Sequence, residues 1–155
     1  MVAVAGCGSA TATTVVKHGQ PAPATGQRYV PSQGNIAACA HAGKAIPLPA
    51  AFPTAFPFPA GTVIDRSGRL LHGQKGVGVY GFVPSATFAS TVNFFKRQVV
   101  ISGFKVLYFQ VDTPHDSEGQ YRGFGKVGEW QVRALPGCRR AMSIAVSAEP
   151  GSGKP

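Results

Sequence analysis

The feature that most constrains the fold of this chain is one apolar helix face, with strand-like segments before and after it. Four apolar residues recur at the spacing of a single helix face, and they are Phe88, Val92, Phe95 and Val99. Segments with the alternation and composition of β-strands stand before and after this stripe. Because strands that follow one another after a helix favour antiparallel meanders, we expect an α+β domain. It should hold a mostly antiparallel sheet of about five to six strands, with one helix packed on one face.

The ends of these elements follow from local residue types. Ser85 can cap the first turn of the helix through its hydroxyl, and Gly103 closes the helix. Turns are expected at Pro114–Gly119 and Leu135–Arg140. The predicted strands cover residues 62–65, 77–82, 105–111, 120–125, 129–135 and 142–147.

A segment rich in proline and phenylalanine precedes the domain. Its prolines exclude a helix or a central strand. Phe52, Phe56 and Phe58 are costly to leave in water, because burying one large apolar side chain is worth about 1.5–3 kcal/mol. We therefore expect residues 35–61 to form an extended, polyproline-like strap packed on the domain. The alternative is a ligand for a proline-recognition module.

The first residues match a lipoprotein processing site. Val4-Ala5-Gly6-Cys7 has the aliphatic and small residues of a lipobox, which predicts a diacylglycerol on Cys7. Residues 1–34 are then the lipobox remnant and a disordered tether rich in small residues and proline. Residues 62–148 form the α+β domain, and 149–155 a disordered tail. If Met1 is the true start, Cys7 is a small residue in a disordered end.

The three cysteines, Cys7, Cys39 and Cys138, are too far apart for a C-x-x-C metal or redox motif. With Cys7 assigned to lipid, Cys39 and Cys138 remain. An oxidising envelope leaves few thiols free, so these two are predicted to form a disulfide. The alternative is two buried free thiols, as in a cytosolic protein.

The formal net charge is +9, but no run of five or more basic residues occurs. The densest cluster is the pair Arg139-Arg140. A dispersed positive charge is compatible with an anionic envelope polymer or a protein partner, and it makes nucleic acid an unlikely partner.

Gly76, Gly78 and Gly81 match the spacing of a phosphate-binding glycine loop. They lie inside a strand pattern, however, and Pro84 separates them from the helix. These glycines are better explained as positions that admit bulky neighbours. The sequence predicts no cofactor-binding residue.

His115, next to Asp116 and near Glu118, is the only acid–histidine neighbourhood; His18, His41 and His72 are scattered. Side chains in a tight turn point apart, so no metal site is predicted. Paired carboxylates for glycoside cleavage would have to come from the five acids of the domain, among which Asp112 and Glu129 could face each other across strands. An ion pair of either acid with Arg122 or Arg133 is the commoner outcome. No catalytic residue is predicted.

Several short motifs occur in a characteristic order, among them Gly81-Phe-Val-Pro84, Tyr121-Arg-Gly-Phe124, Trp130-Gln-Val-Arg133 and Pro136-Gly-Cys138. With them, residues 46–148 resemble a group of small secreted proteins and lipoproteins of actinobacteria. The resemblance implies export and a fold, and it implies no activity.

These observations favour a non-enzymatic, exported cell-envelope lipoprotein domain with a binding or structural role. It would be held by Cys7 at the outer face of the cytoplasmic membrane or in the envelope. One alternative is a small envelope hydrolase, which a deep pocket gathering Asp112, His115 and Glu129 would support. The other is a basic nucleic-acid-binding protein, which would need its arginines on one face. The sequence does not identify the ligand.

Overall fold

The structure is a computed structural model that describes residues 43–70, 74–136, 138 and 140–151. The predicted tether, the first part of the strap and the end of the tail lie outside these residues. The described elements, in chain order, are β1 Val63–Arg69, β2 Val77–Pro84, α1 Phe88–Ile101, β3 Lys105–Thr113, β4 Asp116–Gly123, β5 Lys126–Ala134 and β6 Ala141–Pro150.

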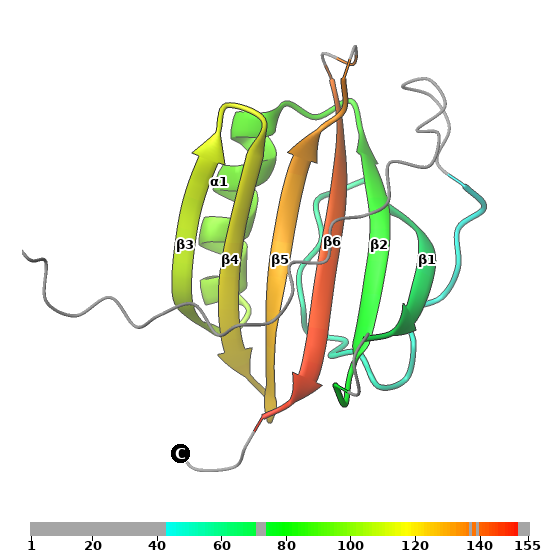
Figure 1. Ribbon diagram of the computed structural model, residues 1–155, viewed down its shortest axis with the longest axis vertical. Helices are drawn as coiled ribbons and strands as arrows, with labels where there is room; N and C mark the ends of the chain where they lie inside the picture. The colour runs from blue at the N-terminus through cyan, green and yellow to red at the C-terminus, as the bar shows by residue number, and fades with distance from the viewer. Residues whose placement is uncertain (1–42, 71–73, 137, 139, 152–155) are drawn as a thin grey trace, which may run out of the picture. The chain divides into compact units, whose positions relative to one another are not determined.

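The six strands form one sheet in the order β1-β2-β6-β5-β4-β3, and every neighbouring pair is antiparallel (Figure 1). Strands β3 to β6 form a meander, and β6 then pairs with β2, which precedes the helix. The predicted α+β class and the predicted number of strands are therefore confirmed.

Helix α1 is fixed by specific caps at both ends. Its N-cap is Thr87, whose hydroxyl accepts a hydrogen bond from the Ser90 N–H at 3.2 Å, while the Ser90 hydroxyl accepts one from the Thr87 N–H at 3.1 Å. The predicted cap at Ser85 was wrong, because only Thr87 has a hydroxyl residue three positions later. Gly103 ends the helix with φ +88° as predicted, and the Phe104 N–H bonds back to the Val99 carbonyl.

The buried core combines residues of α1 with residues of the sheet. The buried helix residues include Val92, Phe95 and Val99, all on the predicted stripe. The helix contacts β3, β5 and β6. The Phe95 ring stacks on Trp130 of β5 with the ring centroids 6.1 Å apart. Each such aromatic contact adds about 0.5–1.5 kcal/mol beyond the burial of its area.

The described part of the strap contributes to this core. Phe52 and Phe56 are 2% and 3% exposed, and the Phe56 ring lies 4.7 Å from that of Tyr121. The segment is not extended throughout. The Phe52 N–H bonds to the Pro49 carbonyl, and the Phe56 N–H bonds to the Pro53 carbonyl, so two turns follow one another. Proline lacks an N–H but keeps its carbonyl acceptor, and each turn thereby directs a phenylalanine inward.

The strand boundaries differ from the predictions in several places, and β1, for example, continues to Arg69, past the predicted end at residue 65. Strand β4 begins at Asp116, inside the predicted turn, and β6 continues to Pro150, inside the predicted tail. Apart from the buried Tyr121, the residues of β4 are polar or glycine, and the Trp130 ring covers Gly119, where a side-chain carbon would lie 2.1 Å from the indole. A strand that receives its apolar cover from its neighbour shows no hydrophobic alternation of its own.

Candidate functional site

A pocket of about 680 Å³ lies at one end of the sheet. It forms where the β3–β4 turn and the β5–β6 turn approach the start of α1. Phe88, Ala134 and Met142 contribute apolar surface from α1, β5 and β6, and the turns add Pro114, His115 and Pro136. This size suits a small organic ligand, and apolar walls with few polar groups are typical of ligand sites.

His115 is held in place by its backbone. Its N–H donates to the Thr113 hydroxyl at 3.1 Å, and its carbonyl accepts from the Ala134 N–H at 2.9 Å. The two turns are thereby joined. Since the backbone is fixed on both sides, the imidazole contributes one polar group to an otherwise mainly apolar wall.

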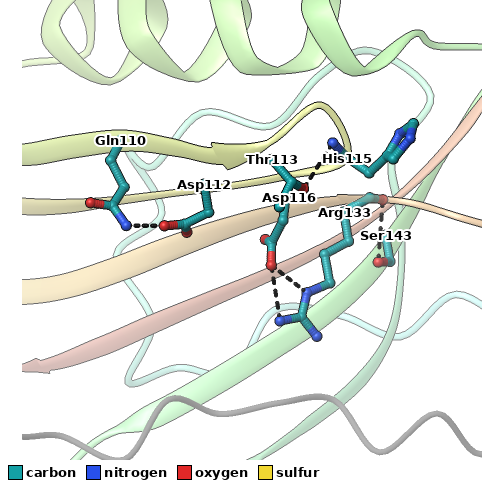
Figure 2. Close-up of polar contacts among 7 residues, drawn as sticks. All are labelled: Gln110, Asp112, Thr113, His115, Asp116, Arg133 and Ser143. Carbon is teal, nitrogen blue, oxygen red and sulfur yellow. Dashed lines mark hydrogen bonds and ion pairs between the residues drawn. The ribbon is translucent and has the colours of Figure 1, made fainter.

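The neighbouring acid does not pair with this histidine. Asp116 forms an ion pair with Arg133, with an O–N distance of 3.1 Å, and Figure 2 shows the His115 ring directed away from that carboxylate. The second carboxylate oxygen of Asp116 is buried without a hydrogen-bond partner among the described residues. An acid in this position stabilises the β4–β5 pairing and does not activate the imidazole.

The other two candidate acids lie apart from the pocket. Asp112 accepts a hydrogen bond from Gln110 (Figure 2), and Glu129 accepts one from Gln120 at 3.0 Å. Of the three residues that would have formed a hydrolytic site, only His115 lines the pocket. The expected ion pair of Asp112 or Glu129 with Arg122 or Arg133 was wrong: among the described residues neither acid forms one, and Arg133 is held by Asp116.

The groups with perturbed pKa values are found elsewhere. Burial raises the pKa of the Tyr121 phenol, whose O–H donates to the Ser147 carbonyl at 2.7 Å. Burial, and then the charge of Glu129, raise the pKa of Glu149. Tyr121 of β4 and Glu149 of β6 both lie toward the end of the sheet opposite the pocket. Both pKa shifts follow from the packing of the sheet.

The glycine motif of β2 admits neighbouring atoms and does not open a helix. A side-chain carbon on Gly78 would lie 2.5 Å from the Tyr80 hydroxyl, and one on Gly81 would lie 2.6 Å from the Val63 carbonyl. The described residues contain no group of three or more potential metal ligands. None of the helices in the part that the structure describes is long and apolar enough to cross a membrane.

Cys138 lies in the β5–β6 turn, where its N–H bonds to the Leu135 carbonyl at 2.9 Å. It packs against a small buried cluster formed by Phe82, Leu135 and Ala141. Cys7 and Cys39 lie outside the described residues, so the disulfide between Cys39 and Cys138 stays a prediction. His18, His41 and His72 also lie outside the described residues.

No family model, no curated protein and no solved structure matches this chain.

The sequence does not predict the pocket, because the residues of its walls are of the types that are common in hydrophobic cores and in turns. Phe88 and Met142 were assigned to the core, and both do bury most of their surface. The sequence did contain one signal, the prolines Pro114 and Pro136. Pro114 lies just before β4 and Pro136 just after β5, and these two strands form a hairpin. To use this signal, one must know which residues pair across the strands of the meander, and the sequence does not show this.

Proposed function

We propose that this chain is an exported cell-envelope lipoprotein, anchored through Cys7, whose domain binds an apolar ligand group without converting it. The observation that carries the proposal is the pocket at His115, which has apolar walls. The three candidate acids, Asp112, Asp116 and Glu129, do not line it, and each has another partner. Such a site offers burial and one hydrogen bond, and it lacks the positioned base–nucleophile pair that covalent catalysis needs.

The proposed architecture includes one helix covering one face of the sheet. The contacts of α1 with β3, β5 and β6 support it, as does the position of the helix behind the strands in Figure 1. With the helix on that face, the start of α1 becomes one wall of the pocket. The ligand would enter from the end of the sheet.

Export is supported by the cysteines. Cys138 would be oxidised to a disulfide in an exported protein, because an oxidising compartment leaves few thiols free. We propose Cys39 as the partner, which leaves Cys7 for lipid. The resemblance to small secreted actinobacterial proteins points the same way.

A neutral apolar probe tests binding. We expect N-phenyl-1-naphthylamine to gain fluorescence on binding the full chain. Ala134→Leu adds volume inside the pocket and should weaken binding by about tenfold or more, because displaced apolar contacts are worth about 1.5–3 kcal/mol. Ala145→Leu, on the opposite face of β6, is the matched control and should leave binding unchanged. Equal effects of the two substitutions, at equal Tm, would exclude the pocket as the binding site.

Anchoring is tested separately. The full-length protein made by a host that processes lipoproteins should partition into detergent, and Cys7→Ala should move it to the aqueous phase. If both proteins partition alike, the lipid anchor is wrong, while the pocket proposal is unaffected.

A further inference from the structure

Exposed apolar side chains gather at the end of the sheet opposite the pocket. The most exposed ones are Val100 at 54%, Ile101 at 72% and Phe124 at 62%. Val100 and Ile101 end helix α1, and Phe124 lies in the β4–β5 turn. A side-chain carbon on Gly103 would lie 3.2 Å from the Phe124 ring, so the helix end and the turn are adjacent. We call Val100, Ile101 and Phe124 the apolar tip.

Phe124 occupies a position that its residue type disfavours. Gly123 pairs with Lys126, so the turn has two central residues, Phe124 and Gly125, with φ values of +51° and +67°. Positive φ at both positions is the type I′ hairpin geometry, in which Asn-Gly is preferred. A phenylalanine here is strained and mostly exposed at once. Its ring contacts Phe104, with the centroids 4.9 Å apart, and yet most of the side chain stays exposed.

Basic residues surround the apolar tip. Lys105 stands directly opposite Arg122 in the β3–β4 pair, although like charges in that position repel. Lys126 follows the turn, and Arg97 lies one helical turn before Ile101, on the same side of α1. Within the described residues no ion pair involves any of these four cations. The sequence contains no Asp or Glu from residue 66 to residue 111.

We propose that this end of the domain docks on a bilayer surface that contains anionic phospholipid. Ile101 and Phe124 enter the boundary between headgroups and acyl chains, and the four cations contact lipid phosphates. Protruding apolar residues with a basic surround are the combination that holds proteins at an anionic interface. This inference goes beyond the proposed function, because it requires neither the lipid on Cys7 nor a ligand in the pocket.

The direct test uses the full chain carrying Cys7→Ala, so that no lipid anchor contributes. We expect it to sediment with vesicles of phosphatidylcholine and phosphatidylglycerol at 7:3, and not with pure phosphatidylcholine vesicles. Added salt should weaken the binding, because screening reduces surface electrostatics. Equal binding to both kinds of vesicle, or none to either, would overturn the proposal.

Substitutions separate docking from folding. Phe124→Asn should lower vesicle binding about tenfold, which corresponds to losing one partly buried aromatic ring. It should not lower Tm, since asparagine suits the turn. Lys105→Gln should lower binding about fivefold, the usual contribution of one cation near an anionic surface. Leu107→Asn is the matched control, an exposed apolar residue of β3 outside the tip. It should leave binding unchanged.

A second copy of the chain is the competing occupant. If sedimentation shows a dimer that Phe124→Asn dissociates, and vesicle binding stays at the parent level, the apolar tip is a protein interface and the membrane proposal is wrong. A monomer whose vesicle binding falls with Phe124→Asn supports it. Ala134→Leu serves as a further control, because it changes the pocket and should not change vesicle binding.

Discussion

The two ends of the sheet hold their apolar side chains in opposite ways. At the pocket end, Ala134 and Met142 line a hollow, and Leu135 is only 4% exposed. At the apolar tip, Ile101 and Phe124 protrude, with 72% and 62% of their surface exposed. The first arrangement encloses a small apolar group, whereas the second presents apolar surface to something much larger than a ligand.

The connections between strands explain this difference. The β5–β6 connection spans residues 135–140, which is long enough for Leu135 to fold back onto Phe82 and Ala141. The β4–β5 connection consists of Phe124 and Gly125 alone. The β4–β5 turn is too short to fold back, so Phe124 projects beyond the sheet. The β3–β4 connection is equally short, but its Pro114 and His115 line the pocket because the longer β5–β6 connection lies beside them.

The pocket and the apolar tip both depend on the same hydrophobic core. The largest effect is therefore expected from a substitution that unfolds this core. Phe95→Asp places a charge against the buried Trp130 ring, and an unpaired buried ion costs several kcal/mol. We expect no cooperative thermal unfolding. Asn93→Asp, an exposed position of the same helix, is the control and should unfold near the parent Tm. A Phe95→Asp protein that melts like this control would contradict the packing of α1.

The next largest effect concerns the pocket end alone. If Cys39 and Cys138 are bonded, Cys39→Ser and Cys138→Ser should each destabilise the protein by about 2–4 kcal/mol. The double substitution should cost no more than either single one, since both remove the same bond. Denaturant unfolding measures these free energies, and Cys7→Ser is the control. Two thiols titrating in the unreduced folded protein would disprove the bond.

At the apolar tip we expect a smaller change in stability, and here the substitution should stabilise the protein. Phe124→Asn relieves a non-glycine residue at φ +51° and should stabilise the protein by about 1 kcal/mol. Urea unfolding would measure the gain. A loss of stability would mean that the contact of Phe124 with Phe104, whose ring centroid lies 4.9 Å away, outweighs the strain. The tip would then be a structural element.

The smallest effect is a pH dependence near the tip. Burial, and then Glu129, raise the pKa of Glu149 in the folded state. A carboxyl with a raised folded-state pKa stabilises the fold at pH values below its unfolded pKa of about 4.3, and that contribution is lost as the pH rises through the folded pKa. Glu149→Gln should therefore raise Tm slightly at pH 7 and leave it nearly unchanged at pH 3. An equal shift at both pH values would exclude this cause.

The sequence predicted the elements whose own residues carry the pattern. The stripe of α1 and the alternation of Met142, Ile144 and Val146 in β6 are examples, because each buries one face directly. Strand β4 was placed too late because its cover comes from Trp130 on the next strand. The Thr87 cap was missed because the reciprocal bond with Ser90 is a pair property that a single residue does not display.

Neither candidate site could be predicted in full. His115 was identified as a polar candidate, but its separation from Asp116 depends on the Arg133 ion pair across β4 and β5. The apolar tip joins the end of α1 to the β4–β5 turn, two segments more than twenty residues apart. Sequence patterns report periodicity within one element, and both sites form between elements.

We expect the pocket to bind an apolar ligand and the apolar tip to bind a membrane, each independently of the other. One crossed measurement tests this. The four proteins to compare are the parent, Ala134→Leu, Phe124→Asn and the double variant, all with Cys7→Ala. We expect Ala134→Leu to weaken only N-phenyl-1-naphthylamine binding, Phe124→Asn to weaken only sedimentation with anionic vesicles, and the double variant to show both losses without interaction. If either single substitution lowers both kinds of binding while the Tm is no lower than that of the parent, the two ends are not separate sites.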